Sequence, residues 1–135
     1  SASAFATLME PRPDSLAEVA RRVLRGGSFG MELADFLDGF RELPGDEAFR
    51  EEPPLLDGQV GNGRWKDAYL AAVAEHLAGL HGLKKWPWMR DPRRSLDEPS
   101  FSCRSPAARL FLLKDSPAAF KSRNLFVGAN SLDRV

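Results

Sequence analysis

Apolar residues recur at three- and four-residue spacing over residues 64–82, RWKDAYLAAVAEHLAGLHG, and this pattern predicts the longest helix of the chain. The residues that share the predicted buried face are Trp65, Tyr69, Ala72, Val73, His76, Leu77 and Leu80. Alanines at positions 71, 74 and 78 broaden this face, so other helices can approach on more than one side. Gly82 is a suitable C-cap residue. We therefore expect 64–82 to be the central helix of the fold.

Two shorter amphipathic stretches precede the central helix. Ser15 and Glu18 form a capping-box pattern ahead of a helix that Gly26-Gly27 ends. A second apolar pattern begins at Met31 and stops at Pro44-Gly45. The short glycine turn between the two stretches predicts a helical hairpin. A further helical turn is expected over residues 46–50, before Pro53-Pro54 imposes an extended segment.

Prolines 87, 92 and 99 make the segment after Gly82 too irregular for a long helix, so it is expected to wrap around the core as an arm. Trp86, Trp88 and Phe101 are large apolar residues that would pin this arm to the core. The alternative is a surface on which bases stack, because arginines are interspersed among these aromatic residues.

The sequence Ser-Pro-Ala-Ala occurs twice, beginning at Ser105 and at Ser116. Each copy is typical of a serine N-cap followed by proline in the first helical position, and predicts a short helix. The first of these helices is almost wholly apolar, and the second should end at Asn124. Residues 125–127 are expected to be extended, and residues 130–135 to begin another helical turn.

These elements predict an all-α fold: a single compact domain of five or six helices over residues 15–135, preceded by a flexible tail over residues 1–14. A length of 135 residues suits one domain. Cys103 is the only cysteine, which excludes an internal disulfide and a four-cysteine zinc site. No apolar run is long enough to span a bilayer, and the N-terminus lacks the pattern of a signal peptide. We expect a cytoplasmic protein with no membrane partner.

The charges are unevenly distributed although the net charge is zero. Residues 1–67 contain 8 Lys/Arg and 13 Asp/Glu, a net of −5, and residues 68–135 contain 11 and 6, a net of +5. Four carboxylates lie at helical spacing on the second predicted helix, at Glu32, Asp35, Asp38 and Glu42. They form either a solvated helix face or a negative surface that occupies a basic groove on a partner.

Catalytic patterns are weak. His76 and His81 are five residues apart, which on a helix leaves the two rings roughly 140° apart, so they do not suit a shared metal ion. Cys103 has no histidine placed near it by local sequence, and the common nucleophile and nucleotide-binding motifs are absent. We expect no enzymatic activity, no metal site and no cofactor.

Five segments together resemble a mostly uncharacterised family of small helical bacterial proteins. They are SLAEVARRV at 15–23, LADFLDGF at 33–40, EEPPLL at 51–56, DAYLAAVAEHLA at 67–78 and SPAAFKSRNLFV at 116–127. Members of this family are encoded beside nucleotidyltransferase-like toxin proteins. The resemblance implies an antitoxin of a type II toxin–antitoxin pair, which neutralises its neighbour-encoded toxin by direct binding. The shared motifs are structural, so they imply a partner and no active site.

The predicted function is accordingly that of a non-catalytic protein-binding module. The candidate partner-binding residues are Glu32, Asp35, Asp38, Glu51, Glu52, Leu55 and Leu56. The alternative is a nucleic-acid-binding regulatory protein that uses basic residues of the second half. Its candidate residues are Arg90, Arg93, Arg94, Arg104, Arg109, Lys121 and Arg123.

Overall fold

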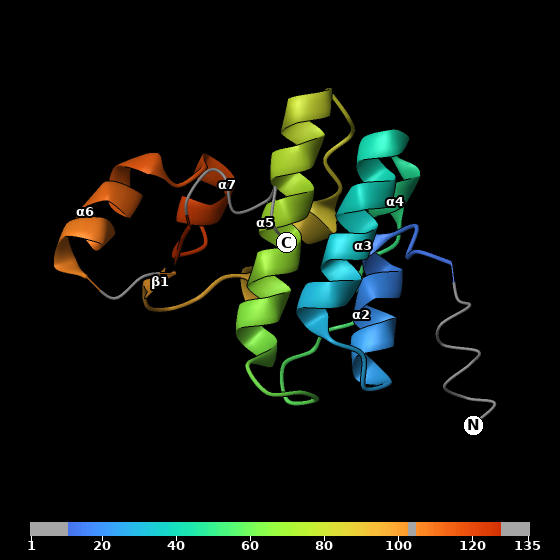
Figure 1. Ribbon diagram of the computed structural model, residues 1–135, viewed down its shortest axis with the longest axis horizontal. Helices are drawn as coiled ribbons and strands as arrows, with labels where there is room; N and C mark the ends of the chain where they lie inside the picture. The colour runs from blue at the N-terminus through green and yellow to red at the C-terminus, as the bar shows by residue number, and fades with distance from the viewer. Residues whose placement is uncertain (1–10, 103–104, 128–135) are drawn as a thin grey trace.

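A computed structural model describes residues 11–102 and 105–127, and it confirms the all-α fold, with 58% of residues helical and six α-helices. The long helix α5 (Gly63–His81) lies at the centre, and the other elements are arranged around it (Figure 1). In chain order the elements are α2 (Leu16–Leu24), α3 (Phe29–Glu42), α4 (Glu47–Arg50), α5, the 3₁₀ helices η1 (Pro87–Arg90) and η2 (Pro92–Arg94), β1 (Ser100–Phe101), α6 (Pro106–Asp115), α7 (Ala118–Lys121) and β2 (Leu125–Phe126).

Helix α5 has the central place that its sequence predicts. Its residues from Asp67 to Glu75 are all buried, so the helix contacts other elements on every side in this stretch. The helix begins after Asn62, which has a left-handed backbone (φ 58°), and ends at Gly82, which is also left-handed (φ 64°). The alanine side chains of α5 are small, which lets neighbouring helices pack closely against it.

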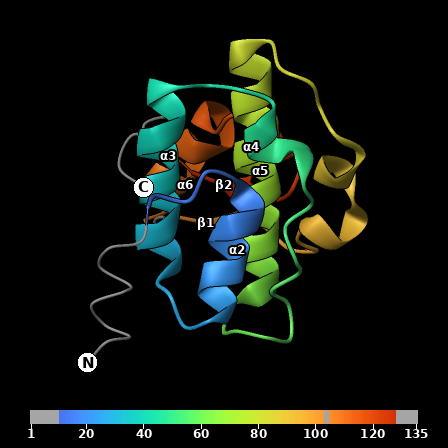
Figure 2. The same ribbon diagram turned by 90° about the vertical axis from the view of Figure 1, so that its right-hand side faces the viewer.

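Helices α2 and α3 form the predicted hairpin on one side of α5 (Figure 2). The side chain of Ser15 caps α2 by accepting a hydrogen bond from the N–H of Glu18 at 3.1 Å, and Ser28 caps α3 in the same way. Phe36 and Phe40 of α3 pack against each other and against Phe49 of α4. This aromatic cluster joins the hairpin and α4 in one core.

The segment after α5 wraps around the core as expected, and Trp88 fixes it there. The indole Nε1 of Trp88 donates a hydrogen bond to the carbonyl of Phe49 at 2.8 Å, and its ring is buried. Trp86 is partly buried against the same core. Phe101 is also partly buried and stacks on Phe126 at 4.8 Å between ring centroids. The three residues therefore anchor the arm.

A buried arginine holds the extended segment of residues 51–57 against α5 and η2. Arg94 is 0% exposed; it donates to the carbonyl of Pro53, and its Nη1 lies 3.8 Å from Oδ1 of Asp67. The two carboxylate oxygens of Asp67 accept hydrogen bonds from the backbone N–H groups of Leu56 and Asp57, at 2.8 and 3.0 Å. Burial is the main influence on both charged groups: it raises the pKa of Asp67 and lowers the pKa of Arg94.

The C-terminal elements form a small β–α–β unit. Strands β1 and β2 pair in parallel, with Ser100 opposite Leu125 and Phe101 opposite Phe126, and helix α6 connects them through α7. Figure 1 shows α6 standing away from the body of the protein. Asn124 has the left-handed backbone (φ 63°) predicted for it.

The two Ser-Pro-Ala-Ala copies differ in structure. Ser105 caps α6 by accepting from the N–H of Ala108 at 3.0 Å, as predicted. Ser116 does not cap α7. Its hydroxyl donates to the carbonyl of Leu112 at 2.6 Å and so completes the end of α6, and α7 begins at Ala118 after Pro117. The short helix predicted for the second copy is therefore present, but the predicted serine cap is wrong, because α6 extends to the serine and its carbonyls compete for the hydroxyl.

The described part of the expected tail, residues 11–14, contacts the body. Pro13 is buried, Arg22 donates to the carbonyl of Pro11 at 2.8 Å, and Arg12 pairs with Glu42 at 3.3 Å. The helical turn expected over residues 130–135 lies outside the described residues. No helix in the described ranges is both long enough and apolar enough to cross a bilayer.

Candidate functional site

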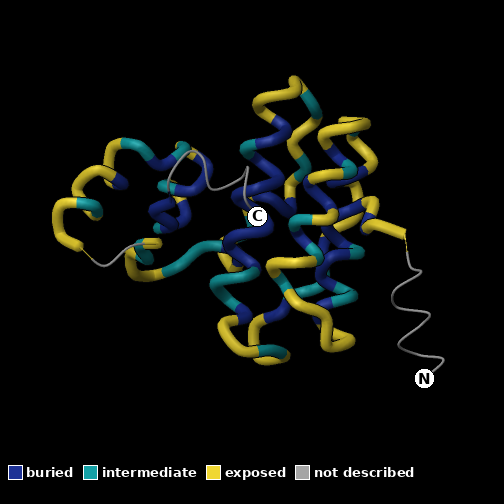
Figure 3. The backbone as a smooth tube through the Cα atoms, viewed as in Figure 1, coloured by how far each residue is buried: buried dark blue, intermediate teal, exposed yellow. Residues whose placement is uncertain are grey.

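Three of the exposed large hydrophobic residues in the described part of the chain lie close together on α6. Leu110, Phe111 and Leu113 are 67%, 63% and 45% exposed, and we call these three residues the α6 patch. Leu112 is buried on the opposite side of the helix, and α6 contacts β2. At about 100° per residue, the three patch residues span about 160° of the helix surface opposite Leu112. In Figure 3 most of α6 is coloured as exposed, in contrast to the buried middle of α5.

The α6 patch is held in place by a well-connected base. The backbone N–H groups of Ser100 and Ser102 donate to the carbonyls of Asn124 and Phe126 at 2.8 and 3.0 Å. The amide of Asn124 donates to the carbonyl of Leu96 at 2.7 Å. These hydrogen bonds join the two strands and the segment before β1 into one base, and α6 contacts this base at β2.

Basic residues flank the α6 patch. Arg109 and Lys114 are both exposed on α6, and the guanidinium of Arg109 lies 5.2 Å from the centre of the Phe101 ring. Asp115 is the acidic residue of this helix. The surface is thus apolar with a net positive border, which complements an apolar groove bordered by carboxylates.

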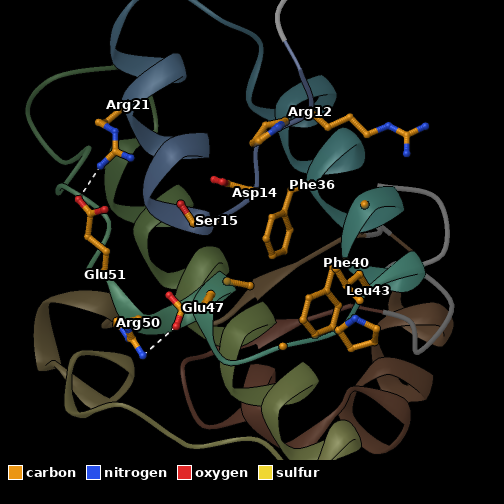
Figure 4. A pocket seen from close by; sticks show the side chains of 15 residues that line it. Arg12, Asp14, Ser15, Arg21, Phe36, Phe40, Leu43, Glu47, Arg50 and Glu51 are labelled. Carbon is orange, nitrogen blue, oxygen red and sulfur yellow. Dashed lines mark hydrogen bonds and ion pairs between the residues drawn. The ribbon is translucent and has the colours of Figure 1, made fainter.

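A hollow of about 590 Å³ lies among α2, α3, α4 and the residues before α2. Figure 4 shows its apolar floor, to which Phe36 and Phe40 contribute, and the charged residues around it. These charges largely satisfy one another: Arg21 pairs with Glu51 at 2.5 Å, and Arg50 pairs with Glu47 at 2.8 Å. The groove therefore has no strong preference for a ligand of either charge.

The acidic residues predicted for partner binding are brought together only in part. Asp35 and Asp38 are exposed on α3, and Asp38 lies 3.5 Å from Arg41. Glu32 is only partly exposed and turns toward α2, where it lies 3.7 Å from Arg22. The acidic surface of α3 is thus smaller than the sequence spacing suggests, because neighbouring arginines compensate part of its charge.

The predicted residues of the segment 51–56 lie outside α3, in the extended segment that follows α4. Glu51 is exposed and paired with Arg21, and Glu52 lies 3.4 Å from the buried Arg94. Leu55 is partly buried, and Leu56 is 0% exposed. Leu56 is thus part of the core and offers no surface to a partner.

The basic residues of the nucleic-acid alternative do not form one surface either. Arg94 and Arg123 are buried, so neither can reach a phosphate. Arg93 pairs with Asp91 at 2.7 Å, and Lys121 donates to the carbonyl of Lys114 at 2.9 Å. Arg90 and Arg109 are exposed on different elements, and Arg104 lies outside the described residues.

The histidines are in separate environments. The ring of His76 packs on Phe120 at 6.2 Å between ring centroids, and burial lowers its pKa. The ring of His81 lies edge-on to Phe40 at 5.2 Å. In the described part of the chain, no three His, Cys, Asp or Glu side chains are grouped so that they could hold a metal ion. Cys103 lies outside that part.

Comparisons with known proteins gave no match to a family model, to a curated protein sequence or to a solved structure. The surfaces of the described residues therefore carry the information about function.

Sequence reasoning did not single out the α6 patch as a binding surface. The signal was present, because residues 110–113 are four consecutive apolar residues on a ten-residue helix. A helix with apolar residues on all sides must either be buried or contact a partner. Only the structure shows that α6 is covered on one side alone.

Proposed function

We propose that this chain is a non-catalytic protein-binding module that docks the α6 patch on a partner protein. The observation that carries the proposal is the exposure of Leu110, Phe111 and Leu113 on a helix held away from the body. Contiguous apolar surface of this kind is typical of interaction sites, and an exposed aromatic residue is a frequent anchor in them. Arg109 and Lys114 favour a partner groove with carboxylates at its border.

The family resemblance suggests who this partner is. It supports the narrower proposal that the chain is the antitoxin of a type II pair and neutralises a nucleotidyltransferase-like toxin encoded beside it. In this proposal Asp35 and Asp38 form a second contact, since they are the exposed ones among the three candidate residues on α3, Glu32, Asp35 and Asp38.

The test is purification of the protein expressed from its native locus, followed by mass spectrometry and chromatography with light scattering. The proposal expects a stoichiometric complex with a neighbour-encoded protein. Replacing Leu110 and Phe111 by serine should abolish the complex and leave the circular dichroism spectrum unchanged, because both side chains are exposed.

Two further variants make this test specific. Leu24→Ser removes a partly exposed apolar side chain from α2 and should leave the complex intact. Reversing the charges of Asp35 and Asp38 tests the α3 surface independently. A complex that survives the double serine variant would show that the α6 patch is not the contact, and loss only on charge reversal would move the contact to α3.

A further inference from the structure

A second, chemically different hollow lies between the last turns of α5, the connection 82–86, η1 and α7. Its volume is about 400 Å³, and it shares no residue with the α6 patch. His76 and Leu80 of α5 form one wall, and Ala118 and Ser122 form the opposite wall. Lys85 and Arg90 complete the border from the two segments between these helices. Four separate parts of the chain thus converge on it.

The charge of this hollow is positive. Lys85 and Arg90 are exposed cations, and the Arg90 side chain is 70% exposed. Among the lining residues that the structure describes, Glu75 is the one carboxylate, and it is 7% exposed. Glu75 is engaged by Nη1 of Arg123 at 3.2 Å and by Nε of Arg90. Among the described lining residues, the two cations Lys85 and Arg90 and the one carboxylate of Glu75 give a net charge of +1, and the buried Arg123 is a second partner of that carboxylate.

We propose that the hollow binds a small phosphorylated molecule, with its phosphate between Lys85 and Arg90. Charge-assisted hydrogen bonds from lysine and arginine are the usual means of holding a phosphate. The hydroxyl of Ser122 donates to the carbonyl of Ala119 at 3.1 Å, so its oxygen can accept a hydrogen bond from a hydroxyl of the organic part. The ring of His76 adds a further polar group, and Leu80 and Ala118 offer apolar surface. A volume of about 400 Å³ is within the range of small-molecule sites.

The test is a titration of the ¹⁵N-labelled full chain, followed by NMR at constant ionic strength, with ribose 5-phosphate, inorganic phosphate and ribose as probes. We expect saturable shifts of the amides of His76, Ala118 and Ser122 with ribose 5-phosphate, weaker binding of inorganic phosphate and no response to ribose. Shifts that do not saturate, or that lie elsewhere on the protein, would overturn the proposal.

Two adjacent lysines provide a matched pair of variants. Lys85→Ala should weaken ribose 5-phosphate binding by about tenfold, since one charge-assisted contact is lost. Lys84→Ala should leave binding unchanged, because Nζ of Lys84 lies 4.0 Å from the centre of the Trp86 ring and outside the hollow. Arg90→Gln should weaken binding as well, with Arg123 still paired to Glu75. Equal affinity for the two lysine variants would exclude the proposed site.

Discussion

The carboxylate of Glu75 lies 3.2 Å from the guanidinium of Arg123, and both side chains are buried although 48 residues separate them. Arg123 also donates to the carbonyls of Ala119 and Met89, so it links α5, α7 and η1. Burial lowers the pKa of Arg123, and the hydrogen bond that it donates to Glu75 opposes that shift. The pair joins the two longest segments on which the family resemblance rests, at 67–78 and 116–127.

Arg123→Ala should destabilise the protein by about 3–5 kcal/mol, because it leaves Glu75 buried with only part of its charge compensated. Urea unfolding followed by circular dichroism measures this change. Arg50→Ala is the control: that arginine is exposed and pairs with Glu47 within the same helical turn, so its removal should change the stability little. Similar values for the two variants would show that the buried pair does not stabilise the packing of α7 and η1 on α5.

A glycine contact fixes the start of α5. A Cβ atom at Gly63 would lie 2.1 Å from the carbonyl oxygen of Leu56, so Gly63→Ala should force the backbone apart and lower the free energy of unfolding by several kcal/mol. Gly30→Ala in α3 is the matched substitution, since a Cβ there meets nothing within 4 Å. It should stabilise the helix by up to about 1 kcal/mol. Thermal unfolding of both variants compares the two positions, and an unchanged melting temperature for Gly63→Ala would contradict the contact.

Asp67 holds the segment 51–57 through two backbone hydrogen bonds. Asp67→Ala removes both acceptors and should cost about 1–3 kcal/mol for each N–H group left without a partner. Asp57→Ala changes an exposed carboxylate in the same segment and should have little effect. Hydrogen exchange of the Leu56 amide provides the measurement, and protection that persists in Asp67→Ala would show that another group satisfies it.

The pKa of the Asp91 carboxyl should be unusually low. The side chain of Arg93 and then its backbone N–H donate to this carboxylate and hold its pKa at about 2. Because the ordinary value is about 3.9, the folded state binds fewer protons between these two values than the unfolded state. The stabilising contribution of Asp91 is therefore complete above pH of about 4 and is lost as the pH falls toward 2.

A ¹³C NMR titration of the Asp91 carboxyl measures this pKa directly. Arg93→Ala should raise the midpoint, and Arg50→Ala, which removes an ion pair on α4, should leave it unchanged. An identical midpoint in the wild-type protein and in Arg93→Ala would show that Arg93 is not the cause.

Several elements could be predicted because their signals are local. The apolar spacing over 64–82 and the left-handed glycine at its end specify α5, and Ser15 and Ser105 specify the starts of α2 and α6. Pairing between distant segments has no such signal. Strand β1 was not predicted, because two residues leave no alternation to detect and its partner lies 25 residues away. Ser116 was misassigned because its hydroxyl can satisfy either the end of α6 or the start of α7.

Local sequence specifies most of the helices, the caps at Ser15 and Ser105 and the central place of α5, since these follow from propensity and periodicity within a few turns of chain. The tertiary structure alone decided which charged and apolar residues face solvent. It buried Arg94 and Arg123, paired much of the acidic set with arginines and exposed the α6 patch. The physical reason is that burial and ion pairing depend on contacts between residues far apart in the chain, which helical spacing does not encode.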